Sequence, residues 1–219
     1  MRQPAQPEVS PRGLGLAALS CAVLVPVCVL WLDRPAALLM HYLFHHSPWF
    51  LGLAAIGQIP LTFALPGLGA AAIASVFGWR PGQRAWLAIA CGVSVGLTIP
   101  TKNMLKAIAG RTWPETWIAN NPSLIRNGVF GFHPFHGGAG WSSFPSGHTA
   151  AIAAVVGVLW WRAPRYRPLW ASLVGLTALG LLLGNIHFFG DILAGGYLGF
   201  AIGTATLALP WPKGDRAAL

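Results

Sequence analysis

Charged residues are scarce in this sequence. Only 9% of its 219 residues are charged, and five of these are acidic. Soluble domains carry roughly a quarter of their residues as charged ones, so the composition excludes an ordinary soluble protein and indicates a membrane-embedded one. The formal net charge is +9. In membrane proteins such an excess gathers at the cytoplasmic ends of the spans, so it does not indicate a nucleic acid partner.

Cysteine is scarce as well. The three cysteines, Cys21, Cys28 and Cys91, all lie inside apolar runs. That placement argues against disulfides, and the sequence has no Cys-x-x-Cys pair and no Cys/His spacing typical of zinc. No cluster of carboxylates offers a magnesium or zinc site either. We therefore expect neither a metal nor another cofactor.

Apolar runs, by contrast, are plentiful, and several approach the length that crosses a ~30 Å hydrocarbon core as a helix. Six spans are expected, over residues 13–32, 60–79, 85–102, 149–161, 169–186 and 189–209. Asp33-Arg34-Pro35 is expected to end the first span, and residues 36–46 are consistent with an interfacial helix. The predicted fold class is all-α, a six-helix transmembrane bundle.

The positions of Lys and Arg predict the orientation of this bundle. Nine of the 14 lie in the N-terminus, the 80–84 turn, the 162–168 turn and the C-terminal tail. The positive-inside rule then places both termini in the cytoplasm. Residues 103–146 become an extended outward-facing loop between spans three and four, on the periplasmic side of a bacterial inner membrane.

The domain organisation follows from the same pattern. Residues 1–12 are polar and Pro-rich and are expected to be a disordered cytoplasmic N-terminus. Residues 13–209 are expected to form a single integral membrane domain, and residues 210–219 a cytoplasmic tail.

A polar stretch, Trp141–Ala150, precedes the fourth span. If a helix begins here, its free N–H groups and partial positive charge suit an anion such as phosphate. Ser146, Gly147 and His148 are the compact polar groups of this stretch. The alternative is a Ser/Thr helix cap with an incidental histidine.

Three more polar side chains are expected at the same membrane face. The third span ends near Lys106, the fifth ends at His187, and the sixth begins near Asp191. Ionisable residues between apolar runs are expensive and usually functional, and a carboxylate near an imidazole fixes its tautomer. The alternatives are a lysine that snorkels to the interface and a His–Asp pair that only caps the sixth span.

Two imidazoles, a carboxylate, a lysine and a helix N-terminus together predict phosphoryl transfer. One imidazole can attack phosphorus and form a covalent intermediate. The other can protonate the leaving oxygen, while the lysine and backbone N–H groups hold the phosphoryl oxygens.

These residues resemble the three motifs of the type 2 phosphatidic acid phosphatase superfamily of membrane lipid phosphatases. Its motifs have the form Lys-x6-Arg-Pro, Pro-Ser-Gly-His and Ser-Arg-x5-His-x3-Asp. The first aligns with Lys106 to Pro114, the second is Pro145 to His148 without change, and the third ends with His187 to Asp191. Motif order and span count match over most of residues 60–209.

The resemblance implies a metal-independent hydrolase of phosphoric monoesters or anhydrides, acting on a lipid phosphate through a phosphohistidine. It implies these roles by position: His187 as nucleophile, Asp191 as its orienting partner, His148 as general acid, and Lys106, Ser146 and Gly147 as phosphate ligands. The surrounding membrane lipids are the other expected partners.

Two departures from the family pattern concern arginine. Trp113 stands at the arginine of the first motif, and Gly180-Leu181 at the Ser-Arg pair of the third. Arginine is the side chain best suited to bidentate phosphate contact. Arg111 is the first candidate for a replacement phosphate ligand. Further candidates lie in the same loop: Arg126, His133 and His136.

The missing arginines leave other functions open. A degenerate family member would bind a lipid phosphate, or move it, without hydrolysing it. A phosphotransferase would pass the phosphoryl group to another lipid instead of water. The sequence selects neither a particular lipid nor an oligomeric state.

Overall fold

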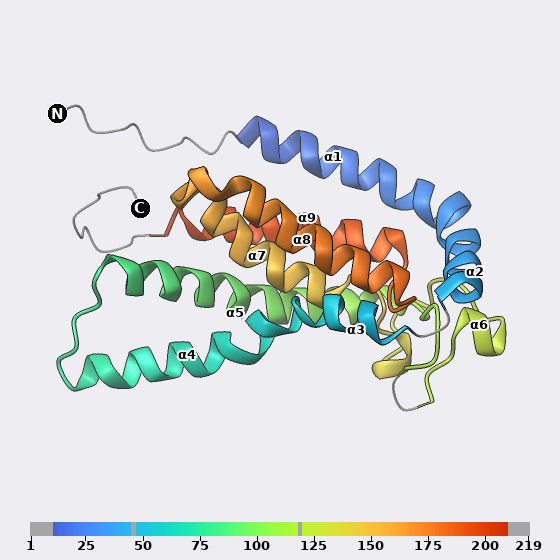
Figure 1. Cartoon of the computed structure of the whole chain (residues 1–219), viewed down its shortest axis with the longest axis horizontal. Coiled ribbons are helices and arrows are strands. Elements are labelled where there is room, and N and C mark those ends of the chain that lie inside the picture. The colour runs from blue at the N-terminus through green and yellow to red at the C-terminus, as the bar shows by residue number, and fades with distance from the viewer. Residues whose placement is uncertain (1–10, 45–46, 118–119, 210–219) are drawn as a thin grey trace.

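A computed structural model of the chain describes residues 11–44, 47–117 and 120–209. Its long helical segments pack side by side, with their ends gathered at two opposite ends of the molecule (Figure 1). The α-helices are α1 Pro11–Val27, α2 Asp33–Phe44, α3 Pro48–Ala55, α4 Gln58–Val76, α5 Gln83–Ala109, α6 Leu124–Asn127, α7 Gly147–Arg162, α8 Arg167–Leu183 and α9 Phe189–Thr206. Between them lie a π-helix, η1 Cys28–Leu32, and two 3₁₀ turns, η2 Ala139–Trp141 and η3 Pro164–Tyr166. The described part of the loop contains isolated β-bridges and no strand, so the all-α prediction is confirmed for these residues.

The first helix does not end where the sequence predicted. Pro26 lies inside α1, and the widened π turn that follows connects α1 to α2 without a break. Proline removes a helical N–H, and both prolines and π turns are common sites of helix bending. Asp33, expected to end the span, is instead 1% exposed and begins α2. Its charge does not end the helix because it is paired inside the protein.

α3 and α4 form a second broken helix, in which α3 leads into the second predicted span. The break falls at Gly57, where an added Cβ would lie 2.8 Å from both the Cβ of His148 and a methyl of Thr177. Only a residue without a side chain permits this approach to α7 and α8. The turn therefore contributes to the surroundings of His148.

α7 is the central helix, and α9 packs closely along it. Glycines recur every fourth residue on the facing side of α9, at Gly195, Gly199 and Gly203. A Cβ at Gly199 would collide with the carbonyl oxygen of Ala150 on α7. Small residues at such spacing let membrane helices approach closely. This contact fixes the start of α7 against the start of α9.

Four helical segments are long and apolar enough to cross a membrane: Arg12–Phe44, Pro48–Val76, Gln83–Ala109 and Pro164–Leu183. Large apolar side chains on the first two point outward, among them Trp31 at 68% and Phe63 at 67% exposure. Surfaces of this kind suit lipid contact, and the chain is a membrane protein. Whether the shorter α7 and α9 also span, as the six-span topology requires, stays a prediction.

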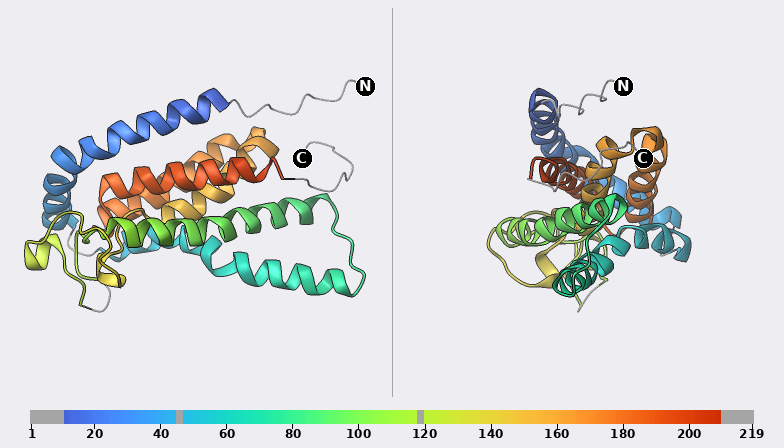
Figure 2. Two further views of the ribbon diagram at one scale, coloured as in Figure 1. Left: turned by 180° about the vertical axis from the view of Figure 1, so that it is seen from behind. Right: turned by 90° about the vertical axis from the view of Figure 1, so that its left-hand side faces the viewer.

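The described ends of the chain and the basic turns lie at one end of the bundle, and the long loop at the other (Figures 1 and 2). The start of α1, the end of α9, the α4–α5 turn and the α7–α8 turn share the first end. α2, α6 and the described part of the 110–146 loop share the second. The expected disordered segment 1–12 lies outside the described residues except for Pro11 and Arg12, which begin α1, and the predicted tail 210–219 also lies outside them.

Candidate active site

His187 lies in the turn between α8 and α9, at the loop end of the bundle, and is 2% exposed. Its Nδ1 is 3.5 Å from Oδ2 of Asp191 and 3.4 Å from the hydroxyl of Ser143. The ring also packs against the indole of Trp113, with centroids 5.1 Å apart. An imidazole held at Nδ1 presents Nε2 on the opposite side of the ring, where a nucleophile would have to act.

Asp191 is held in place from several sides. Its Oδ2 accepts the hydroxyl proton of Ser143 at 2.7 Å and the backbone N–H of Phe188 at 3.1 Å. Its Oδ1 accepts Nη1 of Arg111 at 2.5 Å. The side chain is fully buried, so these bonds replace the water it loses. The carboxylate therefore faces His187 with a fixed orientation.

Arg111 was predicted as a replacement phosphate ligand, and its guanidinium lies among groups of the protein itself. Besides Asp191, its guanidinium donates Nη2 to Asp33 at 2.6 Å, and its side chain is fully buried. Three phenyl rings surround it, with centroids 4.5 Å away for Phe188, 4.8 Å for Phe132 and 5.8 Å for Phe130. Both Nη atoms of Arg111 therefore pair with carboxylates of the protein.

His148 is the second residue of α7, and its ring centroid is 6.4 Å from that of His187. The two imidazoles therefore lie at the same end of the bundle and share one site. Ser146 is the N-cap of α7 and accepts the backbone N–H of Thr149 at 3.4 Å and its hydroxyl at 3.0 Å. Ser146 thus serves as the helix cap that the sequence left as an alternative.

Two lysines of α5 face this site. Lys106, in the last turn, donates to the backbone carbonyl of Ser142 and lies 5.5 Å from the ring centre of Trp113. Lys102, one turn earlier, passes Gly147 at the start of α7, where an added Cβ would be 3.6 Å from its Nζ. The start of α7 is thus flanked by two ammonium groups, only one of which the sequence interpretation included.

The electrostatic surroundings of His187 favour its neutral form. Burial lowers the pKa of His187 below its ordinary value of 6.5, and the charges of Lys106 and Arg111 lower it further. The hydrogen bond and charge of Asp191 act in the opposite direction. A neutral imidazole is the form that can attack phosphorus.

The other loop candidates contact residues of the loop itself. Arg126 bonds to Asn120 at the surface. His133 and His136 pack against Trp141, with ring centroids 4.5 and 4.3 Å from it. A separate cluster ties α2 to the loop: Nδ1 of His41 lies 2.7 Å from Oε1 of buried Glu115, and Asn185 donates to the same oxygen at 2.9 Å.

Three residues of the site were missed by sequence reasoning: Asp33, Ser143 and Lys102. Asp33 is 158 positions before Asp191, and its place beside a helix break resembled a span end. Ser143 stood inside the polar stretch but outside the family motif. Lys102 could have been found, since it precedes Lys106 by one helical turn and must share its face.

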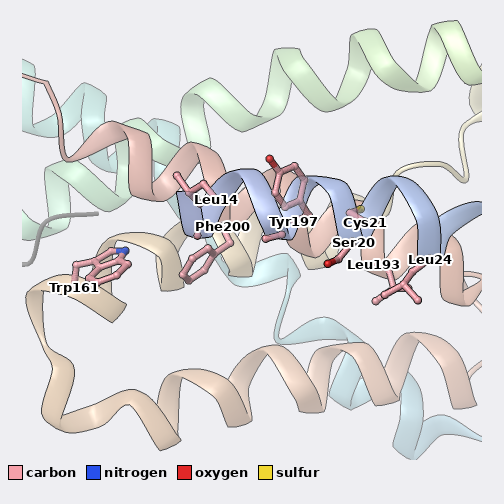
Figure 3. A pocket seen from close by; sticks show the side chains of 10 residues that line it. Leu14, Ser20, Cys21, Leu24, Trp161, Leu193, Tyr197 and Phe200 are labelled. Carbon is pink, nitrogen blue, oxygen red and sulfur yellow. The ribbon is translucent and has the colours of Figure 1, made fainter. Parts of the chain in front are cut away.

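A cavity of about 580 Å³ lies away from these groups, between α1, α7 and α9 (Figure 3). Its wall is apolar and includes Leu14, Leu24, Leu193 and Phe200. None of its lining residues is charged, so it offers no phosphate site.

The family model of the PAP2 superfamily matches residues 86–215, more than half of the chain. The chain belongs to the PAP2 superfamily. Two curated relatives are lipid A 1-phosphatases, from Rhizobium etli and Rhizobium johnstonii, each 30% identical over 93 residues. These matches cover 42% of this chain and 37% and 35% of the relatives. The aligned region thus spans little more than a third of their length.

A solved structure supports the PAP2 fold over nearly the whole chain. The transmembrane PAP2-type phosphatidylglycerolphosphate phosphatase from Bacillus subtilis superimposes with a TM-score of 0.52 at 18% identity. The match covers 90% of this chain and 94% of the other. At this identity the likeness concerns the fold alone.

Proposed function

We propose that this PAP2 protein is a lipid phosphatase that hydrolyses a phosphate monoester or pyrophosphate through a phosphohistidine on His187. The observation that carries the proposal is the buried His187–Asp191–Ser143 contact beside His148 at the start of α7. The family membership and the phosphatase names of the relatives support it.

In the first half-reaction, Nε2 of neutral His187 attacks phosphorus and forms a P–N bond. The P–O bond to the lipid breaks, and His148, which this step requires in its protonated form, gives its proton to the leaving oxygen. Asp191 stabilises the positive charge that develops on the attacking imidazole. Its bond from Ser143 keeps the carboxylate in that position.

In the second half-reaction, His148, now neutral, takes a proton from water. The resulting oxygen attacks phosphorus, the P–N bond breaks, and inorganic phosphate leaves. His187 returns to its neutral form and His148 to its protonated form. The cycle balances without a metal or another cofactor.

Lys106, Lys102 and the N–H groups at the start of α7, including that of Gly147, supply the positive surroundings for phosphate. Two lysines and a helix N-terminus take the part of the missing motif arginines. Ser146 supports this arrangement as the cap of α7. Lysine binds phosphate as a point charge and lacks the bidentate fork of arginine.

The proposed site lies at the outward, periplasmic face of the inner membrane. The basic turns at the opposite end of the bundle support this orientation. A lipid substrate would then present its phosphate at the loop end of the helices. The names of the relatives make lipid A 1-phosphate and phosphatidylglycerol phosphate the first substrates to test.

The direct test is phosphate release from these two lipids, undecaprenyl pyrophosphate and phosphatidic acid by protein purified in detergent. Replacing His187 by alanine should lower kcat by at least about a thousandfold, because covalent catalysis is lost. His136→Ala, a loop histidine away from the proposed machinery, is the matched control and should keep parental activity. Full activity of His187→Ala would reject the assigned nucleophile.

A second function is favoured by Trp113 and Leu181, which stand where the family arginines would be. A protein that binds a lipid phosphate without hydrolysing it would show saturable binding, no phosphate release and no phosphohistidine on the same four lipids. Turnover of any of them excludes this alternative.

A further inference from the structure

A chain of buried charges connects the first helix to the proposed nucleophile. Asp33 on α2 accepts Nη2 of Arg111, and Asp191 on α9 accepts Nη1. The other oxygen of Asp33 accepts the backbone N–H of Gly190 at 3.1 Å, immediately before Asp191. α2 is therefore bonded both to the arginine and to the backbone that carries the catalytic carboxylate.

We propose that Asp33 and Arg111 are positioning residues that set the charge Asp191 offers to His187. The inference rests on the proposed function, because it concerns the same site. In this proposal Arg111 acts on His187 through Asp191 and does not bind the phosphate of the substrate.

The charge balance of the three side chains carries this inference. Two carboxylates and one guanidinium have a net charge of about −1, and all three side chains are fully buried. A positively charged imidazolium ring at His187 brings this sum toward zero. Buried charges interact strongly when water is excluded, so the trio favours the transition state for attack.

Asp33 also limits how strongly Arg111 can neutralise Asp191. Each carboxylate receives one nitrogen of the guanidinium, and Oδ2 of Asp191 stays directed at Ser143 and His187. Without Asp33, the guanidinium would pair with Asp191 alone. The carboxylate would then stabilise a charged imidazole less well.

Geometry argues against one simpler role for Arg111, and the experiment separates a second. A phosphate ligand needs an accessible donor directed at the substrate, whereas both Nη atoms of Arg111 bind carboxylates. Its Nε has no hydrogen-bond partner in the described structure but is buried, and phenyl rings surround the group. A purely structural bridge would be indifferent to the charge of its partners. The two variants below separate that role from the proposed one.

Other charges face His187 and enter its titration. They are Asp191 on α9, Lys106 on α5, His148 on α7 and Arg111 in the loop. The experiment leaves Asp191, Lys106 and His148 unchanged in every variant, so that their contributions cancel in the comparison.

The experiment follows the titration of His187 by NMR in the full chain, labelled with ¹⁵N and ¹³C at histidine and purified in detergent. The His187 signal is assigned by its loss in His187→Gln. The variants are Asp33→Asn, Arg111→Gln and the double variant. Arg34→Gln, an exposed charge change in the same helical turn, is the control.

Asp33→Asn should lower the pKa of His187 by about one unit, and Arg111→Gln should raise it by a similar amount, as expected for one buried charge nearby. The double variant restores the net charge and should titrate near the parent. Arg34→Gln should not shift. Unchanged titration in Asp33→Asn, or shifts of one sign in both single variants, overturns the proposal.

Arg111→Gln leaves two buried carboxylates without their cation and is the variant most at risk of misfolding. Asp33→Asn leaves one carboxylate paired with the guanidinium, and the double variant leaves a single carboxylate with the parent's net charge of about −1. A downward shift in the first that disappears in the second then supports the proposal, and no shift overturns it.

The activity of the same proteins distinguishes this proposal from the proposed function. Asp33→Asn should lower kcat at least tenfold with KM within about twofold of the parent, because a positioning residue does not touch substrate. A parent protein without turnover on any lipid would reject the proposed function. The NMR titration would still decide whether the charge trio controls His187.

Discussion

At the scale of single residues, the burial of His187 has a consequence for pH dependence. Only the neutral imidazole attacks, and burial lowers the pKa of His187 below 6.5. The neutral fraction therefore survives as the pH falls through 6.5, and it is lost only further into the acid range. We predict that the acid limb of kcat/KM lies below pH 6.5.

The measurement is kcat/KM for phosphate release between about pH 4 and about pH 8, which reports ionisations of the free enzyme. A lipid pyrophosphate and a lipid monoester should be compared, because the substrate ionises too. An acid limb above pH 6.5 with both substrates contradicts the proposed state of His187.

The two lysines of α5 lead to a second prediction at this scale. Lys102→Gln and Lys106→Gln should each raise KM or lower kcat/KM by about tenfold to a hundredfold, as expected when a charge-assisted hydrogen bond to phosphate is lost. Arg126→Gln, which removes an exposed loop charge, should leave both constants unchanged. Lysines that only snorkel or hold the loop would alter thermal stability and leave the kinetics as in the parent.

At the scale of helices, the α7–α9 contact holds the site together, because it joins the helix that begins at Gly147 to the one that carries Asp191. Gly199→Ala places a methyl group against the carbonyl of Ala150. Overpacking of this kind costs about 1–3 kcal/mol. We predict a lower thermal midpoint in detergent and a loss of phosphate release at temperatures where the parent is active.

Gly175→Ala is the matched control for this change. It lies in the middle of α8, where nothing is within 4 Å of an added Cβ. Its thermal midpoint should equal or slightly exceed that of the parent, since alanine favours the helix. Equal midpoints for the two variants would contradict the account of the α7–α9 contact.

The sequence predicted most of the helices because apolar runs and their breaks are local properties. It indicated a possible helix start within Trp141–Ala150, because a proline, a serine and a glycine stand there before an apolar run. α7 does begin in this stretch, at Gly147. The prediction was wrong about the end of the first helix. Asp33 is a span-ending charge only if it faces solvent, and its partner Arg111 comes from a loop that no local pattern places.

The site, too, could be predicted only where it depends on local patterns and not on contacts made by the fold. His148, His187 and Asp191 lie at the ends of successive predicted spans, so their convergence at one end of the bundle could be predicted from the order of those spans. The role expected for Arg111 rested on the absence of the family arginine at position 113. The sequence does not show where the guanidinium of Arg111 points. Only the fold shows that its guanidinium points toward two carboxylates.

At the scale of the whole molecule, the account requires the long loop and the basic turns to lie on opposite sides of the membrane. We predict that Gly137→Cys in the loop reacts with a membrane-impermeant maleimide in intact cells whose outer membrane is permeabilised. Gly82→Cys in the α4–α5 turn should react only after lysis. Both positions are exposed and open to an added side chain.

This labelling requires a background in which Cys21, Cys28 and Cys91 are replaced by alanine, so that each variant has one thiol. Labelling of Gly82→Cys and protection of Gly137→Cys in intact cells would reverse the proposed orientation. Equal labelling of both would contradict the proposed placement of the two turns on opposite sides.

The central claim is that His187 carries the phosphoryl group during turnover. The most direct measurement is rapid quenching of the purified protein with a lipid labelled at phosphorus, under alkaline conditions that preserve a P–N bond, followed by peptide mapping. The account predicts label on the peptide that contains His187 and none in His187→Gln. Turnover of the same lipid with no labelled protein, or with label on another residue, would contradict it.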